Sequence, residues 1–164
     1  MDVKPDNILL KDSVHPHAKL SDFGTAVHFR DSNEVHDDVV GTAQYCAPEV
    51  IRKSYVPKIA DMWSAGMTLF CVLAGDPAYD GPYDELTMHR VLSDKLVLPR
   101  TITQNYSVAC LNFLMSLLRR KVDHRMSVAD ALKHPWIQAG GVGAPEMDVP
   151  TSEDPAVGLH LTMV

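Results

Sequence analysis

The sequence predicts a mainly α-helical domain that begins with a short β-hairpin. Near the start, two short apolar or alternating runs, 8–10 and 18–21, enclose a turn-rich stretch, which is typical of a hairpin. From Ala47 onward, apolar residues recur at helical spacing. The chain has 164 residues, of which 46% are hydrophobic and 22% charged, and these values suit one domain with its own core.

The hairpin leads into a long polar stretch that runs from Asp22 to about Cys46. This stretch holds few apolar residues and shows no helical period, so we expect a loop. A loop of this length inside a compact domain is usually either functional or disordered.

Helices are expected over most of the chain that follows. The central one is apolar on nearly all sides, which is typical of a buried helix. Ser107 and Ser127 are N-cap candidates, and Asp130 follows Ser127 in a weak capping-box pattern. Pro135 should bend or end the last helix. The expected helices are 47–53, 59–74 (the central one), 84–92, 107–119 and 127–137.

The composition argues against several classes of protein. A net charge of −6 disfavours nucleic acid or an anionic membrane as the main partner, although a basic peptide is compatible with it. Cys46, Cys71 and Cys110 lie far apart and form no CxxC pair, which fits a reducing compartment better than disulfides or zinc. The start is polar, unlike a secretory signal, and the longest apolar run, 65–74, is too short for a bilayer. We therefore expect a cytoplasmic or nuclear protein.

Four polar residues suggest phosphate and metal chemistry. Asp2, Lys4 and Asn7 share the first loop, and the hairpin would bring Asp22 back beside them. Carboxylate and amide oxygens are hard ligands that suit Mg²⁺ together with phosphate oxygens. An ammonium group could neutralise a moving phosphoryl group, and a free carboxylate could accept a hydroxyl proton. Each residue alone would fit a solvated turn, so the hypothesis depends on the combination.

Three motifs follow one another along the chain: DVKPDN begins at Asp2, DFG at Asp22 and APE at Ala47. In this order and spacing they resemble the eukaryotic protein kinases, and Lys4, two residues after Asp2, is similar to the serine/threonine-specific branch. The stretches GTAQYCAPE, DMWSAG and KHPWI also fall where that family would place them.

The resemblance runs from Asp2 to about Ile137. It implies a mainly α fold over 1–138, namely the helical large (C-terminal) lobe of a protein kinase with a short β-hairpin and no N-terminal lobe. Residues 139–164 are rich in Gly, Pro and acidic side chains and have no period, so we predict a disordered tail there.

The family implies an activity, the transfer of a phosphoryl group from ATP to Ser or Thr side chains of a protein substrate. Asp2 would be the catalytic base, and Lys4 would contact the transferring phosphate. Asn7 and Asp22 would hold Mg²⁺ and with it the nucleotide. Thr42 would bond to Asp2 and Lys4 and help to seat the acceptor residue.

Other matching residues would hold the lobe together. Phe23, followed by Gly24 in the metal-binding turn, would pack as a switch that reports the active state. Glu49 would form a buried pair with Arg125. Asp61 would anchor the backbone of the catalytic loop.

Within the kinases, DVVGTAQYCAPEVI followed by YVPK and HPWI is most similar to the calcium- and calmodulin-regulated group, particularly the calcium-dependent kinases of plants and protists. A calcium-sensing protein or domain would then be a regulatory partner, although the calcium-binding lobe of such kinases is not in this sequence. Gln44 and Cys71 occupy places where some basic-directed kinases have acidic residues. We therefore expect no strong demand for Arg two residues before the acceptor.

The sequence departs from the family pattern around two residues. Met1 stands where the family has an Arg, which normally pairs with a phosphate on the activation loop. At the matching activation-loop position the chain has Asp38 rather than Thr or Ser. A fixed carboxylate there would need no phosphorylation, but Asp37 and Asp38 would equally fit a solvated acidic turn.

The nucleotide-binding parts of a kinase have no counterpart in this sequence, because the Gly-rich loop, the strand Lys with its Glu partner and the adenine hinge would all precede Met1. We therefore expect the chain alone to be inactive, and helix 59–74 and strand 8–10 to be partly uncovered. Two interpretations stay open: a fragment or truncated gene model of an active serine/threonine kinase, and a non-catalytic kinase-like scaffold or interaction module. An unrelated metal-dependent phosphatase or nuclease would not explain the motifs from APE to KHPWI.

Overall fold

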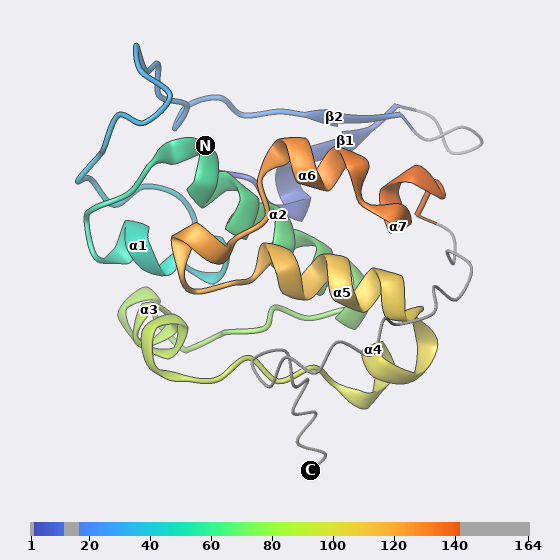
Figure 1. The fold of residues 1–164 in the computed structure, drawn as a ribbon. Coiled ribbons are helices and arrows are strands. Elements are labelled where there is room, and N and C mark those ends of the chain that lie inside the picture. Colours follow the sequence, from blue (N-terminus) through green and yellow to red (C-terminus); the bar gives the residue numbers. More distant parts are fainter. Residues whose placement is uncertain (1, 12–16, 142–164) are drawn as a thin grey trace.

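The computed structural model describes residues 2–11 and 17–141 (Figure 1). A small two-stranded sheet lies against one side of a helical body, so the predicted mainly α fold class is confirmed. No helix among the described residues is long and apolar enough to cross a bilayer. Of the predicted disordered tail, 142–164 lie outside the described residues, and 139–141 form a turn after the last helix.

The first structural unit is the predicted hairpin. A 3₁₀ turn over Pro5–Asn7 leads into β1 (Ile8–Leu10), which pairs antiparallel with β2 (Ala18–Leu20). The hairpin therefore returns the chain to the loop from which it started. The paired residues are Ile8 with Leu20, Leu9 with Lys19, and Leu10 with Ala18.

The central helix, α2 (Pro57–Ala74), packs against α5 (Val108–Leu117). Gly75 ends α2 with a left-handed φ of 87°, which glycine adopts without strain. Gly66 allows the two helices to approach closely, because a Cβ at this position would lie 2.9 Å from the Cβ of Leu117. This contact builds the main core of the domain.

The other helices surround α2 and mostly follow the predicted ranges. Ser107 and Ser127 cap α5 and α6 as expected, since each hydroxyl oxygen accepts a backbone N–H over 3.2 Å. Pro135 ends α6 as expected, and a short α7 follows it. The bounds are α1 (Pro48–Ile51), α3 (Asp84–Ser93), α4 (Arg100–Asn105), α6 (Val128–Lys133) and α7 (Pro135–Gln138).

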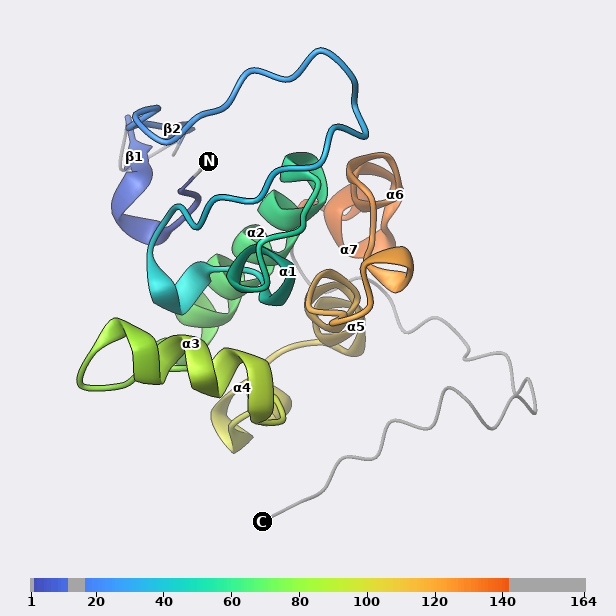
Figure 2. The ribbon, with the colours of Figure 1, turned by 90° about the vertical axis from the view of Figure 1, so that its left-hand side faces the viewer.

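A long segment, 21–47, connects the hairpin to α1 and corresponds to the predicted loop. Figure 2 shows it as an arch that leaves the hairpin and returns to the helical body. An isolated β-bridge between His36 and Tyr55 and a 3₁₀ turn at Ala43–Tyr45 attach the arch to that body.

The expected partial exposure of the hairpin and of the central helix is confirmed. Leu9 and Leu10 of β1 are 56% and 66% exposed, and Val72 near the end of α2 is 66% exposed. Eight of the 18 residues of α2 are nevertheless buried, and Trp63 and Met67 are almost fully inaccessible. The domain therefore has a closed core and a hairpin with uncovered apolar side chains.

Candidate functional site

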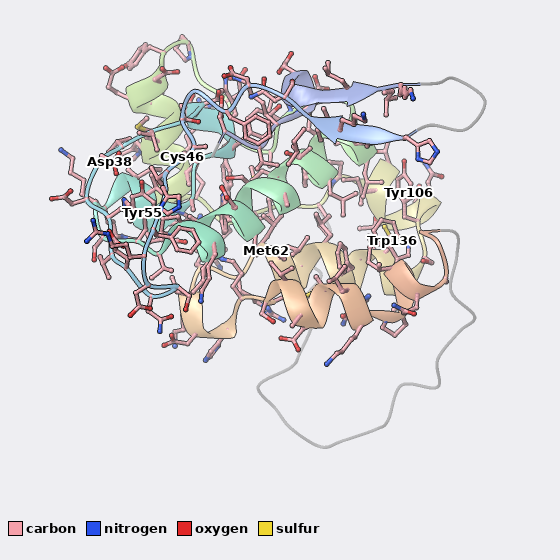
Figure 3. The ribbon with its side chains drawn as sticks, turned by 90° about the horizontal axis from the view of Figure 1, so that it is seen from above. Asp38, Cys46, Tyr55, Met62, Tyr106 and Trp136 are labelled. Atoms are coloured by element: carbon pink, nitrogen blue, oxygen red, sulfur yellow. The ribbon has the colours of Figure 1, made fainter. Side chains whose placement is uncertain are left out.

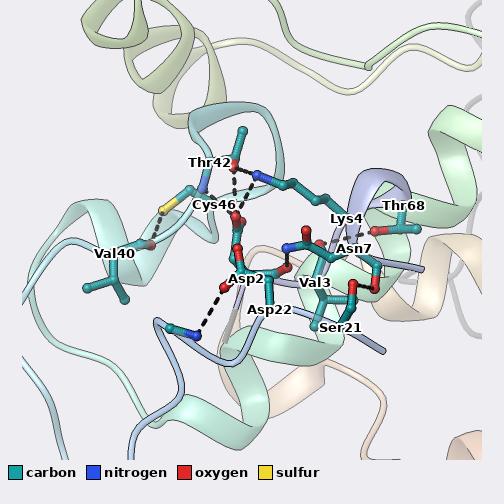
Figure 4. Close-up of polar contacts among 11 residues, drawn as sticks. Asp2, Val3, Lys4, Asn7, Ser21, Asp22, Val40, Thr42, Cys46 and Thr68 are labelled. Atoms are coloured by element: carbon teal, nitrogen blue, oxygen red, sulfur yellow. Dashed lines mark hydrogen bonds and ion pairs between the residues drawn. The ribbon is translucent and has the colours of Figure 1, made fainter. Parts of the chain in front are cut away.

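Asp2, Lys4 and Thr42 form a closed polar cluster (Figure 4). The Nζ atom of Lys4 lies 2.7 Å from Oδ2 of Asp2 and donates to Oγ1 of Thr42 over 2.6 Å. Thr42 donates twice to Asp2, from its backbone N–H to Oδ1 and from its hydroxyl to Oδ2, both over 2.9 Å. The structure therefore brings together three predicted site residues from two distant loops.

The central helix holds both loops of this cluster. The hydroxyl of Thr68 in α2 donates to the carbonyl oxygen of Val3 over 3.2 Å, which fixes the first loop. One turn earlier in α2, the hydroxyl of Ser64 donates to the carbonyl oxygen of Tyr45 over 2.9 Å, which fixes the second loop. Because both hydroxyls belong to one rigid helix, the two loops keep a fixed relative position.

Gly41 allows the second loop to approach Asp2. Its φ of 97° lies in the left-handed region that other residues rarely adopt. A Cβ on Gly41 would also lie 3.4 Å from Oδ1 of Asp2, in direct contact with the carboxylate. Glycine therefore turns the backbone so that the next residue, Thr42, can donate its N–H to that oxygen.

The Asp2 carboxyl group is held in its ionised form. Partial burial raises its pKa, but hydrogen bonds from Lys4 and Thr42, together with the charge of Lys4, hold the pKa below its ordinary value. An ionised carboxylate can orient a hydroxyl group and accept its proton. The adjacent ammonium group can stabilise negative charge that develops on a phosphoryl group.

Asn7 and Asp22 lie on neighbouring turns and are suited to Mg²⁺. The buried side chain of Asn7 donates to the carbonyl oxygen of Asp2 over 2.8 Å, which fixes the amide beside the cluster. Ser21 donates its N–H and its hydroxyl to the carbonyl oxygen of Asn7 over 2.8 and 3.1 Å, and so holds the next residue, Asp22, nearby. The exposed Asp22 carboxylate accepts the N–H of Gly24 over 3.1 Å. One amide and one carboxylate oxygen are enough for Mg²⁺ when phosphates and water supply the other ligands.

A small cavity beside Asp2 is lined mainly by the arch and α2, and by neither Lys4, Asn7 nor Asp22. Its volume is about 20 Å³, which is space for about one water molecule. The described residues also contain no group of three or more His, Cys, Asp or Glu side chains that could hold a metal ion by itself. A metal ion bound by Asn7 and Asp22 would therefore depend on further ligands such as phosphate oxygens.

Glu49 in α1 and Arg125 after α5 form a buried ion pair. The NH1 group of Arg125 contacts Oε1 of Glu49, and its NH2 group donates to Oε2 over 2.9 Å. Arg125 also donates to the carbonyl oxygens of Arg119 and Ile59, both over 3.0 Å, and lies 5.2 Å from the ring centroid of Trp63. The two predicted partners are thus in direct contact, and they join α1, α2 and the chain after α5.

Phe23 and Asp61 have different surroundings. The Phe23 side chain is 60% exposed, so the packing expected of a switch residue is not seen among the described residues. Phe23 stands three residues after β2, at the start of the arch, where its neighbours Asp22 and Gly24 are exposed as well. Asp61 is partly buried in α2, where burial raises its pKa. Its predicted role as an anchor for the catalytic loop stays a prediction.

Tyr55 is a candidate that the sequence did not reveal. Its hydroxyl donates to Oδ1 of Asp38 over 2.8 Å, although Asp38 lies at the surface. Tyr55 begins the stretch YVPK, which indicated a kinase subgroup but no contact. The one available signal was a lone aromatic residue in a polar stretch, and its partner lies 17 residues away.

The family model described as protein kinase domain matches residues 1–137. This chain belongs to the protein kinase domain family. The kinase domain is 34% identical over 142 residues to calcium-dependent protein kinase 19 of Arabidopsis thaliana, covering 85% of this chain and 25% of that protein. It is 38% identical over 138 residues to serine/threonine-protein kinase atg1 of Dictyostelium discoideum, covering 83% of this chain and 20% of that protein. It is 35% identical over 139 residues to serine/threonine-protein kinase ULK3 of Rattus norvegicus, covering 84% of this chain and 29% of that protein.

The family predicted from the motifs is therefore confirmed, including the similarity to serine/threonine kinases and to calcium-dependent protein kinases. The kinase domain spans about a quarter of the length of the curated relatives it matches. Use of ATP and Mg²⁺ is general in the family, and both metal-ligand candidates, Asn7 and Asp22, lie within the matched region.

Proposed function

We propose that this kinase domain provides the acceptor side of the catalytic site of a serine/threonine protein kinase. The proposed reaction transfers a phosphoryl group from ATP to a Ser or Thr hydroxyl of a protein substrate. The observation that supports it is the contact among Asp2, Lys4 and Thr42, which brings a carboxylate, an ammonium group and a hydroxyl within 2.6–2.9 Å of one another. Family membership supplies the reaction class, and this cluster supplies the chemistry.

In the proposed mechanism Asp2 orients the acceptor hydroxyl and takes its proton. The acceptor oxygen forms a bond to the γ-phosphorus, the bond from that phosphorus to the bridging oxygen breaks, and ADP leaves. Lys4 neutralises charge on the transferring group, while the two hydrogen bonds from Thr42 keep the carboxylate oriented. Mg²⁺ held by Asn7 and Asp22 would neutralise the charge of the phosphates.

We further propose that the 164-residue chain alone does not catalyse this transfer. The Gly-rich loop and the strand Lys, which place the nucleotide in the family, have no counterpart in the sequence. Positioning and electrostatic stabilisation supply nearly all of the catalysis in phosphoryl transfer. A site that cannot place ATP should therefore have no measurable turnover.

The proposal is tested on the natural gene product that contains this sequence, with ATP, Mg²⁺ and a library of Ser and Thr peptides. The wild-type protein should phosphorylate a subset of the peptides, and Asp2→Asn should lower kcat by about 10²–10⁴-fold because the base is lost. The matched control is Asp123→Asn, which makes the same chemical change at an exposed position between α5 and α6. A wild-type protein without transfer to any peptide, or an Asp2→Asn variant with full activity, would contradict the proposal.

A calcium-sensing protein or domain is proposed as the regulatory partner. The support comes from the names of relatives, several of which are calcium-dependent protein kinases, while others are not named for calcium. The same peptide assay, run with calcium and with a calcium chelator, tests this point. Equal rates under the two conditions would remove calcium from the proposal without affecting phosphoryl transfer.

The alternative role is a non-catalytic kinase-like scaffold. One observation favours it: the apolar side chains of β1 are uncovered. Calorimetric titration of the natural gene product that contains this sequence with ATP and Mg²⁺ distinguishes the two roles. Binding that Asp22→Asn abolishes would count against a pure scaffold, because a scaffold does not need a metal ligand.

A further inference from the structure

One hydrogen bond attaches the arch to the helical body outside the cluster of Asp2, Lys4 and Thr42, which is called the catalytic cluster below. The hydroxyl of Tyr55 donates to Oδ1 of Asp38 over 2.8 Å. Figure 3 shows the two residues next to each other, close to Cys46, at one end of the molecule. Tyr55 is 5% exposed and stands just before α2, so it is a rigid donor for a residue on the arch.

The backbone strengthens this attachment. His36 and Tyr55 exchange two hydrogen bonds, from the His36 N–H over 2.8 Å and from the Tyr55 N–H over 3.1 Å. Their rings also lie side by side, with centroids 5.8 Å apart. Tyr55 of the helical body therefore binds two residues of the arch, His36 and Asp38.

The attachment lies four residues before Thr42. Between Asp38 and Thr42 the chain contains only two valines and Gly41, whose left-handed turn directs Thr42 at Asp2. A short tether of this kind limits the positions that Thr42 can reach. Loss of the Asp38 contact should therefore loosen the hydrogen bond from the Thr42 N–H to the Asp2 carboxylate.

Asp38 works here as a hydrogen-bond acceptor and not as half of an ion pair. Among residues 2–11 and 17–141, Lys4 pairs with Asp2 and Arg125 pairs with Glu49, and Nε2 of His36 lies 4.0 Å from Oε1 of Glu34. None of these contacts includes Asp38. Burial, followed by the hydrogen bond to Asp38, raises the pKa of Tyr55, so the hydroxyl keeps the proton that it donates.

We propose that Tyr55 is a positioning residue for the catalytic cluster, and that its hydrogen bond to Asp38 sets Thr42 on Asp2 without phosphorylation of the arch. The consequence for catalysis rests on the proposed kinase function, whereas the structural coupling does not. The proposal differs from the idea of Asp38 as a fixed mimic of a phosphate, because a mimic acts through its charge and needs a cation.

Hydrogen exchange of the 164-residue chain tests the structural coupling. Tyr55→Phe removes only the hydroxyl, and the amide of Thr42 should exchange about tenfold faster, as expected when a partly buried hydrogen bond is lost. Tyr106→Phe is the matched control, since its hydroxyl donates to Leu73 over 3.4 Å at the opposite end of the molecule (Figure 3). Unchanged exchange at Thr42 in Tyr55→Phe would overturn the proposal.

Substitutions of the surface residue Asp38 separate hydrogen bonding from charge. Asp38→Asn keeps an acceptor oxygen for Tyr55, so exchange at Thr42 should stay within about twofold of wild type, whereas Asp38→Ala should match Tyr55→Phe. Asp37→Ala, the exposed neighbour, should have no effect. If Asp38→Asn loosens Thr42 as much as Asp38→Ala does, the charge is what matters and the proposal is wrong. Amides of α5 report global unfolding, and the Asp38 variants decide the question even if Tyr55→Phe is unstable.

Kinetics of the natural gene product test the catalytic consequence. Tyr55→Phe and Asp38→Ala should raise the KM for the peptide more than they lower kcat, and Asp38→Asn should restore the wild-type KM. Phosphatase treatment of the wild-type protein should leave the rate unchanged, and a loss of rate would contradict the proposal. A wild-type protein without transferase activity would remove the proposed function, while the exchange data would still decide the coupling.

Discussion

The Glu49–Arg125 pair places two opposite charges inside the domain, where each depends on the other. Glu49 is 7% exposed and Arg125 is 6% exposed. The guanidinium group has other acceptors, the carbonyl oxygens of Arg119 and Ile59, but it is the partner of both carboxylate oxygens of Glu49. Removal of one partner therefore leaves an uncompensated charge in a medium of low dielectric constant.

Glu49→Ala should lower the free energy of unfolding by about 3–5 kcal/mol, because Arg125 would remain buried without its counter-charge. The measurement is urea denaturation followed by circular dichroism. Arg119→Ala is the control at an exposed neighbour, where a change of less than about 0.5 kcal/mol is expected. The double variant Glu49→Leu with Arg125→Met should lose less free energy of unfolding than the sum of the losses for Glu49→Leu alone and Arg125→Met alone. Simple additivity of the two losses would show that the pair is not coupled.

At the scale of elements, the N-cap of α7 is a neutral histidine, His134. The Trp136 N–H donates to Nδ1 of His134 over 3.2 Å, and Nε2 of the same ring lies 3.2 Å from Oδ1 of Asn112. The ring also packs on Phe113, with centroids 5.1 Å apart. An accepting Nδ1 and a donating Nε2 require the neutral ring, and burial lowers the pKa of His134 below its ordinary value.

Stability should therefore fall in mildly acidic solution through His134. Since the unfolded chain binds this proton more tightly than the folded protein does, the contribution is complete above about pH 6.5 and is lost as the pH falls through the lower folded pKa. Thermal unfolding from pH 8 to pH 5 measures it. The control, His134→Asn, retains a side chain that can cap α7 but cannot titrate, so its Tm should decline less below pH 6.5. Parallel Tm curves for the two proteins would contradict the prediction.

The elements predicted from the sequence are those with local signals. Ser107 and Ser127 mark helix starts because a hydroxyl three residues before a free N–H is enough to cap it, and no distant residue is needed. In contrast, α4 was not predicted. Its six residues bury one apolar side chain, Ile102, and a single anchor has no period to detect.

At the scale of the whole molecule, the candidate site depends on contacts between distant loops. The family resemblance named Thr42 as a partner of Asp2, although 40 residues separate them, because the motifs already encode that contact. Nothing in the spacing named Tyr55 as the partner of Asp38, since the contact follows from how the arch folds back on the body. Physical patterns therefore predicted the elements, the resemblance predicted most of the site, and the fold alone revealed the attachment of the arch.

The hairpin exposes apolar side chains on the surface of the domain. Leu9 and Leu10 are exposed, and β1 and β2 form a two-stranded sheet with two open edges. Exposed apolar side chains on an open edge promote association between copies. In the 164-residue chain, Leu10→Lys should therefore raise the monomeric fraction at high concentration, as measured by size-exclusion chromatography with light scattering. The Tm should stay almost unchanged, because Leu10 buries little surface. Val35→Lys adds the same charge at an exposed valine of the arch. If it raises the monomeric fraction equally, net charge and not the hairpin controls association.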